Sequence, residues 1–305
     1  MLTLSDCSSI ELSNAFDAGH FRLHIGPLVL KVSSNIPEFV SIFRQLYGDH
    51  PVSLNGDEYD FDLAVRPPSL FRRWIRRNAT FEFCGDAPFL PMEVGHAYAM
   101  FEWGLNWAVA SFLHNHLILH SAVVEWKGKG VLLSAVSGSG KSTLSAELSL
   151  QGWRLLSDEL ALLDDELNLI PLARPVSLKN SSIDLIRSRH PSAEIGPLAR
   201  DTHKGTVGHL KVSGESIAQS LRPAIPKLII FPKWSAGSPL RVVPVGAGQA
   251  AMRLIDQAFN YAILGTEGFQ RLVALVRNAE AWEIEYSSLD EAREALETLV
   301  EECGQ

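Results

Sequence analysis

A short stretch in the middle of the chain carries residue types whose spacing is typical of phosphate binding. It runs from Ala135 to Ser142, reads AVSGSGKS, and matches the pattern G-x-x-x-x-G-K-[ST] except at its first position. Ala135 replaces the first glycine of the pattern, which costs little if the backbone there keeps a negative φ. We interpret the stretch as a phosphate-binding loop rather than as a plain turn before a surface helix.

Each residue type in this loop has its own task on a nucleotide. Gly138 and Gly140 lack a Cβ, so backbone N–H groups can approach phosphate oxygens closely. The helix that follows adds the positive end of its dipole. Lys141 would neutralise the β- and γ-phosphates, and the Ser142 hydroxyl would hold a metal ion. The sequence therefore predicts ATP and Mg²⁺ as cofactors, bound by Ser137, Gly138, Ser139, Gly140, Lys141, Ser142 and Thr143.

The elements that must position the loop are predicted from apolar patterns. A strand over 131–136 should deliver the loop, and a helix with leucines at helical spacing over 144–150 should follow it. A second strand over 153–156 should then end on the acidic pair Asp158-Glu159. The layout of strand, loop, helix, strand and acid predicts a phosphate-binding βαβ unit.

Asp158 is the acid that this layout would bring to the loop, if the two strands pair in parallel. A carboxylate at that place can hold Mg²⁺ together with Ser142, or take a proton from an attacking hydroxyl. The neighbouring Glu159 is the second candidate catalytic acid. Asp164, which follows the apolar run 160–163, is the rival metal ligand, although its acidic run is typical of an exposed turn.

His120 is the candidate catalytic histidine. It lies in a strand predicted over 117–126, which should pair antiparallel with the strand that carries the loop. Such a histidine is either a hydrogen-bonded core residue or a functional group near the phosphates, and both interpretations stay open here. His114 and His116 lie close in sequence, but no cysteine or carboxylate completes a zinc ligand set, so we expect no zinc site.

The rest of the chain predicts an α/β protein with two domains. Alternating runs around Gly26-Pro27 and around Asn55-Gly56 predict two hairpins, so residues 1–92 should form a small, mainly β N-terminal domain. Residues 93–305 should form the nucleotide-binding domain, in which the mixed order of elements predicts a mixed sheet. Long helices are expected over 91–114 and 250–264.

Composition narrows the class of protein. The 305 residues carry a net charge of −8, which argues against a nucleic-acid partner. The longest apolar stretch contains several histidines and asparagines, so we expect no membrane span. Three widely spaced cysteines and the lack of a signal-peptide pattern at the N-terminus predict a cytoplasmic protein.

Taken together, these motifs resemble the HPr serine kinase/phosphorylase superfamily, and most closely its branch called HprK-related kinase A. The resemblance covers roughly residues 97–290, and the phosphate loop also resembles that of ATP-type phosphoenolpyruvate carboxykinase. The residues that carry it are Phe101-Glu102-Trp103, Leu117-Ile118-Leu119-His120, Ser137-Gly138-Ser139-Gly140-Lys141-Ser142, Gly152-Trp153-Arg154-Leu155-Leu156-Ser157-Asp158-Glu159 and Arg174-Pro175-Val176-Ser177-Leu178-Lys179-Asn180.

The resemblance implies a P-loop core of the HPr-kinase type and transfer of the γ-phosphate of ATP to a hydroxyl. It implies that Asp158 acts as the general base, that His120 assists near the transferred phosphoryl group, and that Ser142 and Asp158 hold Mg²⁺. Thr143 stands where bifunctional members usually have Glu, and Glu159 where they usually have a second Asp. Both departures count against the reverse reaction and against HPr as the substrate.

Relatives in peptide-modification systems phosphorylate serine hydroxyls, so the resemblance implies a peptide or small protein as the acceptor. Two other functions stay open: a nucleotide-dependent ATPase or switch that binds a partner, and a small-molecule kinase. Homo-oligomerisation also stays open. Four residues of the polar middle stretch either steady the phosphates or the acceptor, or belong to solvated loops: Arg174, Lys179, Lys204 and His209.

Overall fold

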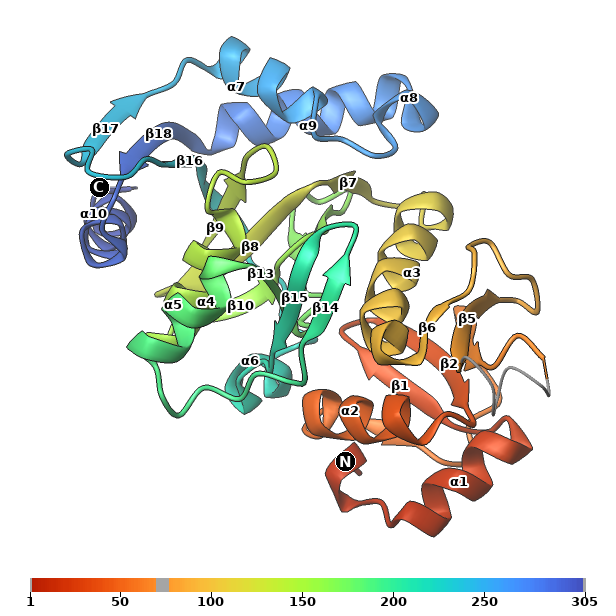
Figure 1. Cartoon of the computed structure of the whole chain (residues 1–305). Coiled ribbons are helices and arrows are strands. Elements are labelled where there is room, and N and C mark those ends of the chain that lie inside the picture. The colour runs from red at the N-terminus through yellow and green to blue at the C-terminus, as the bar shows by residue number, and fades with distance from the viewer. Residues whose placement is uncertain (1, 70–76, 304–305) are drawn as a thin grey trace. The chain divides into compact units, whose positions relative to one another are not determined.

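The computed structural model describes residues 2–69 and 77–303. The chain forms two compact units (Figure 1). The first comprises Met1–Val109 with Ser177–Ile217, and the second comprises Ala110–Val176 with Ala218–Gln305. The division predicted between residues 92 and 93 stays a prediction.

The first unit is built on a sheet with the strand order β3-β1-β2-β4-β5-β6. Its strands are β1 (Arg22–Ile25), β2 (Leu28–Ser34), β3 (Val52–Ser53), β4 (Phe61–Arg66), β5 (Asn78–Phe83) and β6 (Met92–Glu93). The helices along this part of the chain are η1 (Leu4–Asp6), α1 (Ser9–Ala18), α2 (Pro37–Tyr47), η3 (Val94–His96) and α3 (Ala97–Phe112). Residues from the middle of the chain add β13 (Val176–Lys179), α5 (Ser181–Arg189), β14 (Ala199–Thr202), β15 (Gly205–Leu210) and α6 (Gly214–Ala218). The strands of this second group form a smaller sheet with the order β13-β15-β14.

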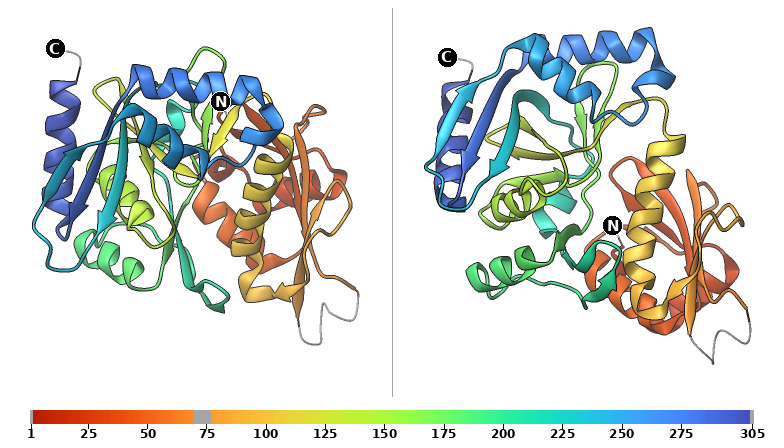
Figure 2. Two further views of the ribbon diagram at one scale, coloured as in Figure 1. Left: turned by 90° about the horizontal axis from the view of Figure 1, so that it is seen from above. Right: turned by 45° about the horizontal axis from the view of Figure 1, so that its top comes forward.

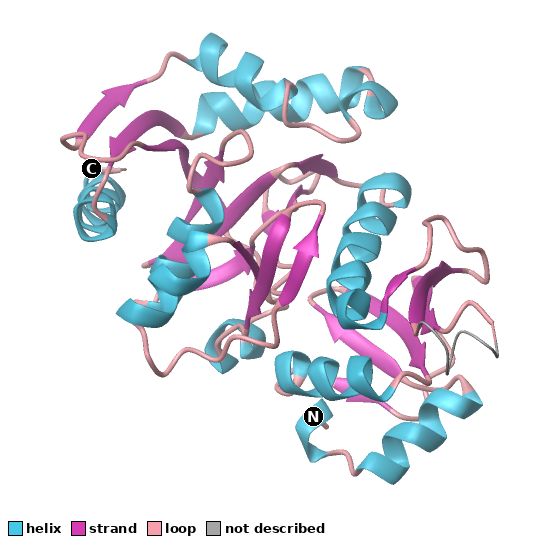
Figure 3. Cartoon of the chain, viewed as in Figure 1, coloured by secondary structure: helices cyan, strands magenta, loops and turns pink. Residues whose placement is uncertain are grey.

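Aromatic side chains from α2 and α3 fill the core of this unit. The ring of Phe101 lies 5.4 Å from that of Phe39 and 5.7 Å from that of Phe43, centroid to centroid, and all three are fully buried. Figure 3 distinguishes the helices from the strands in this part of the chain. The strands expected in this region are present, and the helices α1, α2 and α3 share the unit with them.

One of the two predicted N-terminal hairpins is confirmed and the other is wrong. β1 and β2 pair antiparallel around Gly26-Pro27. The strands on either side of Gly56 do not pair with each other, because β3 joins β1 while β4 runs parallel to β2. Gly56 instead packs under the side chain of Arg22, where an added Cβ would lie 2.5 Å from the Arg22 Cγ. The glycine there serves close packing rather than a turn.

The second unit holds a large sheet with the order β10-β8-β9-β16-β18-β17 and a small sheet with the order β12-β11-β7. Their strands are β7 (Leu117–Leu119), β8 (Ser121–Trp126), β9 (Lys129–Ser134), β10 (Arg154–Ser157), β11 (Ala161–Leu163), β12 (Leu169–Ile170), β16 (Ile225–Trp234), β17 (Arg241–Pro244) and β18 (Glu280–Tyr286). The helices are α4 (Lys141–Leu150), α7 (Ala247–Ile255), α8 (Tyr261–Leu264), α9 (Thr266–Asn278) and α10 (Leu289–Glu302).

The large sheet is mixed, as predicted. β9, β16 and β18 run parallel to one another, whereas β8, β10 and β17 are each antiparallel to their neighbours. The predicted direct pairing of the loop strand β9 with β10 is wrong, because β8 lies between them. Lys127 and Gly128 both have positive φ, of 52° and 80°, which suits the tight turn that folds β8 back onto β9. β10 then adds to the free edge of β8, so it runs in the same direction as β9 without touching it.

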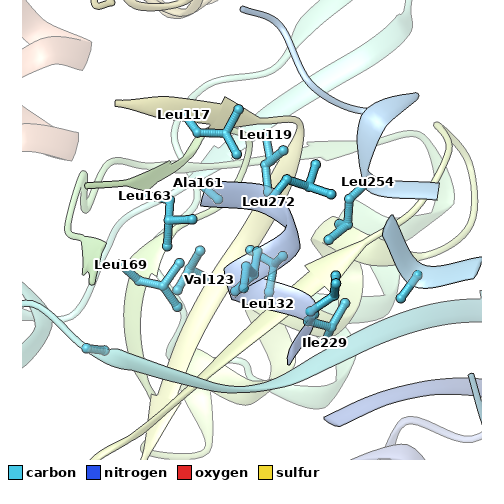
Figure 4. Close-up of a cluster of buried hydrophobic side chains, with 14 of the residues drawn as sticks. Leu117, Leu119, Val123, Leu132, Ala161, Leu163, Leu169, Ile229, Leu254 and Leu272 are labelled. Atoms are coloured by element: carbon cyan, nitrogen blue, oxygen red, sulfur yellow. The ribbon is translucent and has the colours of Figure 1, made fainter. Parts of the chain in front are cut away.

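Helices cover both faces of the large sheet (Figure 2). α4 contacts β8, β9 and β10, and α10 contacts α4 and β18. α7 and α9 pack against the opposite face. Figure 4 shows the core on that face, where Leu132 and Ile229 of the sheet meet Leu254 of α7 and Leu272 of α9, all of them fully buried. Burial of each such side chain contributes about 1.5–3 kcal/mol, which fixes the strands that carry the site.

Two predicted helices have different bounds in the structure. The helix expected from residue 91 begins at Ala97, since Met92–Glu93 pairs with β5 as β6. The helix expected over 250–264 is interrupted between α7 and α8, where the chain runs beside β7. There Asn260 accepts a hydrogen bond from the Ile118 N–H (2.9 Å) and donates one to the His116 carbonyl (2.7 Å). The segment between α7 and α8 was predicted to be helical, but its backbone and the Asn260 side chain bond to the edge of β7.

Across residues 2–69 and 77–303, every helix falls short of the length and apolar character that crossing a membrane requires.

Candidate active site

The predicted phosphate-binding loop connects β9 to α4, and its backbone is shaped to receive an anion. Gly138 and Gly140 have φ of 89° and 92°, a conformation that side chains with a Cβ rarely adopt. The Ser139 N–H donates to the Val136 carbonyl (3.3 Å), which closes the turn, and Gly140 caps the helix. The first N–H groups of α4, from Lys141 onward, precede the intrahelical ladder, so they are directed to the open end of the helix.

The underside of the loop rests on the ends of two parallel strands. The Trp234 N–H, at the end of β16, donates to the Ser139 carbonyl at 2.9 Å. A Cβ on Gly140 would lie 3.0 Å from both the Trp234 Cβ and the Tyr286 hydroxyl. Position 140 therefore favours glycine for two reasons: its φ is positive, and a Cβ there would be too close to Trp234 and Tyr286.

Lys141 is buried, with 7% of its surface exposed, although its side chain is charged. Its ammonium donates to the main-chain carbonyl of His120 at 3.3 Å. A buried cation on the first turn of a helix, beside N–H groups aimed outward, makes this end of α4 strongly favourable for phosphate.

Asp158 is also buried, with 6% exposed. One carboxylate oxygen accepts a hydrogen bond of 2.7 Å from the Ser145 hydroxyl on α4. Ser145 lies in the next turn after Ser142, so this bond fixes the carboxylate beside the first turns of the loop helix. The acid predicted from sequence is therefore held near the loop, although β10 does not pair with β9.

His120 and Asp158 both lie where the chain passes from one sheet to the other, and these two crossing points are neighbours in the strand pairing. At His120 the chain passes from β7 of the small sheet to β8 of the large one. The three residues from Asp158 to Leu160 make the corresponding passage from β10 to β11. Because β8 pairs with β10 and β7 with β11, the two breaks face one another across the strands. Both breaks put side chains at the edge where the phosphate loop begins.

The backbone of His120 is hydrogen-bonded, and the residue is half-buried. Its N–H donates to the Gln257 carbonyl at 2.7 Å, and its ring lies 5.8 Å from that of Phe259, centroid to centroid. The predicted continuous strand over 117–126 is therefore broken at the histidine itself. A half-buried ring at a bend is better placed for contact with a ligand than a histidine inside a strand would be.

The rival acid Asp164 lies at the opposite end of β11. Its two carboxylate oxygens accept hydrogen bonds from the main chain (2.7 Å) and side chain (3.1 Å) of Asn168. Asp165 and Glu166 beside it are exposed, as predicted for an acidic turn between β11 and β12. Burial lowers the pKa of the His116 ring, and the negative charge of Asp164 opposes this shift only in part. Asp164 therefore stabilises its own turn, away from the loop.

The other predicted residues divide between the two units. Glu159 follows Asp158 and is half-buried, and Arg174 is buried in the second unit. Lys179, Lys204 and His209 belong to the first unit. There the Lys204 ammonium lies 5.1 Å from the centre of the Trp103 ring, and His209 packs edge-on against Tyr98.

Three residues near the loop were not expected from the sequence: Ser145, Trp234 and Tyr286. Ser145 is three residues beyond Ser142, but nothing in a helical pattern says that its hydroxyl meets an acid from the next strand. Trp234 and Tyr286 end strands that are far along the chain, and the parallel pairing of β9, β16 and β18 alone brings them to the loop.

The oxygen donors at this site fit magnesium. Within the described residues there is no group of three or more His, Cys, Asp or Glu side chains that could hold a metal ion by itself. A hydroxyl from Ser142 and a carboxylate from Asp158 are hard donors, and Mg²⁺ usually takes one or two protein oxygens, with water and phosphate oxygens completing the set. Such a donor set suits a metal that arrives with the nucleotide.

No protein-family model matches the sequence, and no curated protein matches it either. Among solved structures, the chain is similar to the Hpr(Ser) kinase/phosphatase from Coxiella burnetii, with 14% sequence identity and a TM-score of 0.26. The match covers 60% of this chain and 93% of the other. A likeness this slight assigns neither a fold nor an activity, so the family resemblance depends on the sequence motifs.

Proposed function

We propose that the protein is an ATP-dependent kinase that transfers the γ-phosphoryl group to a serine- or threonine-type hydroxyl of a peptide or small protein. The observation that carries this proposal is the buried Asp158 carboxylate, fixed by Ser145 at the phosphate-binding end of α4. An ATPase or switch also uses an acid beside the loop to hold its metal ion, and the transfer assay described below separates it from a kinase. In a kinase, the buried acid next to the loop has a second use, because it can take the proton of an incoming hydroxyl.

The proposed reaction uses the chain's own groups in separate roles. The loop N–H groups and Lys141 would bind the β- and γ-phosphates, and Ser142 and Asp158 would hold the metal ion. Mg²⁺ bound there would neutralise charge on the phosphates. Asp158 takes the proton of the acceptor hydroxyl as its oxygen bonds to the γ-phosphorus, and the bond to the bridging oxygen breaks to release ADP. In this proposal His120 contacts the transferred group, and Glu159 is the second candidate acid.

The peptide acceptor and the cytoplasmic location rest on sequence. The motifs resemble those of kinases that act on hydroxyls, including relatives that modify peptides. The three cysteines are free thiols, which agrees with a reducing compartment. The net charge of −8 favours neither nucleic acid nor an acidic partner.

The test is a transfer assay with γ-labelled ATP, Mg²⁺ and the peptides or small proteins encoded by neighbouring genes. Label on a serine or threonine of one of them, lost with EDTA and in Asp158→Asn, supports the proposal. Release of free phosphate alone would favour an ATPase or switch. Label on a small metabolite would favour a small-molecule kinase.

A further inference from the structure

In the proposed function, the γ-phosphate and the nucleoside of a bound nucleotide lie on opposite sides of β9. Asp158 and His120 both come from the side occupied by β8 and β10, so the γ-phosphate must face that side. This step rests on the proposed function. The nucleoside then leaves the loop towards β16 and β18, whose carboxyl ends lie at the same edge because both run parallel to β9.

Trp234 stands at that place, at the last position of β16. Half of its surface (50%) is exposed, although its main chain holds the loop through the bond to Ser139. The indole N–H donates to the Ser287 carbonyl at 3.3 Å. The ring is therefore anchored at its edge, and much of the remaining ring surface is open.

The segment that follows Trp234 is rigid as well. The Ser235 N–H donates to the Tyr286 carbonyl (2.9 Å), and the Ser287 hydroxyl donates to the Ser238 carbonyl (2.9 Å). These bonds join the end of β16 to the end of β18. A ring that is already immobilised loses little conformational entropy when a flat ligand stacks on it.

We infer that Trp234 is the surface on which the nucleobase of the bound nucleotide stacks. Single exposed aromatic residues are common on proteins and need no explanation by themselves. Trp234 differs because it is fixed next to the phosphate loop, on the side away from the acid. Stacking uses the π-face that every base has, so this contact alone favours nucleotides over inorganic phosphates without choosing between adenine and guanine.

Phe259 is a second half-exposed aromatic residue near the site, with 48% exposed. Its ring lies against that of His120, on the side where the phosphoryl group is transferred. A base placed there would direct the γ-phosphate away from Asp158. Phe259 is therefore excluded as the base platform by the same geometry that selects Trp234.

The test compares the binding of ATP and of tripolyphosphate, each with Mg²⁺, to the full chain by titration calorimetry. Trp234→Ala keeps the main-chain N–H and the Cβ that pack against the loop. We expect it to weaken ATP binding by about tenfold and to leave tripolyphosphate binding within about twofold of the wild type. Trp234→Phe should restore most of the ATP affinity. Trp282→Ala, in the same sheet with its indole directed to Glu280, is the matched control and should change neither.

Unchanged ATP affinity in Trp234→Ala would overturn the inference and leave the kinase proposal intact. Equal loss of ATP and tripolyphosphate would also overturn it, because it would mean that the indole supports the loop and not the base. A wild-type chain that binds neither ligand would remove both the kinase proposal and this inference.

Discussion

The two sides of the loop strand β9 are built in contrasting ways. On the side of β8 and β10 both strands break and change sheet, and the buried Asp158 and the half-buried His120 lie at these breaks. On the side of β16 and β18 the strands run parallel to β9, and Trp234 and Tyr286 at their ends pack against Gly140 of the loop. The difference indicates that the polar groups of the candidate site come from irregular backbone, whereas continuous parallel strands lie beneath the loop.

Lys141 lies between the two sides, so changing it should have the largest effect. Lys141→Ala removes the cation from the binding end of α4, which weakens ATP binding and also removes stabilisation of the transferred charge. We expect kcat/KM to fall by about 10⁴-fold or more. The exposed Lys127, paired with Glu301 at 2.6 Å, gives a control. Lys127→Ala should retain nearly all activity, and an equal loss in both variants would contradict the assignment.

Asp158→Asn should separate phosphoryl transfer from ATP binding. The amide is nearly isosteric but cannot take a proton, so kcat should fall by about 10²–10⁴-fold while the Kd of ATP without metal changes little. Asp164→Asn, at the far end of β11, is the matched control and should leave transfer unchanged. Unaltered kcat in Asp158→Asn would exclude this residue as the base, and a large loss in Asp164→Asn would favour the rival acid.

Gly140→Ala tests the aromatic side. Its positive φ alone should cost roughly 1–2 kcal/mol of unfolding free energy. The contacts at 3.0 Å with Trp234 and Tyr286 should add to this cost and displace the loop. Gly152 has the same φ of 92° but no atom near its Cβ position, so Gly152→Ala measures the backbone strain by itself. Denaturant unfolding of both variants should show a larger loss for Gly140→Ala, and equal losses would contradict the close packing.

Tyr286→Phe should have the smallest effect. The Tyr286 hydroxyl is buried and has no hydrogen-bond partner among the described residues, and burial raises the pKa of this phenol, so the group stays neutral. Its removal should leave the unfolding free energy unchanged or raise it by up to about 1 kcal/mol.

Tyr47 provides the contrast for this variant. Its hydroxyl donates to the buried Glu102 at 2.8 Å, so Tyr47→Phe should destabilise the fold by about 1–3 kcal/mol. A loss of ATP affinity in Tyr286→Phe would mean that this hydroxyl donates to the loop once a nucleotide binds.

The local parts of the site were predictable from sequence, and the parts that depend on long-range pairing were not. Glycines, a lysine and a hydroxyl at fixed spacing define the predicted loop because phosphate contacts of this kind come from consecutive residues. The two acidic sites, Asp158 and Asp164, could be ranked because an acidic run between short apolar segments is typical of a turn. The mixed sheet was predicted, but its strand order was not, since apolar runs do not say which neighbours they pair with.

The failures have physical causes in particular residues. Asn55-Gly56 reads as a hairpin turn, yet the glycine makes room for Arg22. The stretch 250–264 has helical spacing, yet Asn260 is used to satisfy the edge of β7. In each case a tertiary contact decided the outcome.

The central position of β9 also bears on how the chain folds. Its second neighbour is β16, and Leu132 pairs with Ile229, so the sheet around the loop closes only across a long stretch of sequence. Until that stretch has left the ribosome, β9 has β8 on one side and an open apolar edge on the other. Pairing of such distant strands is slow. Nucleotide binding should therefore appear late in synthesis, and chains that stop before β16 should expose this edge and aggregate.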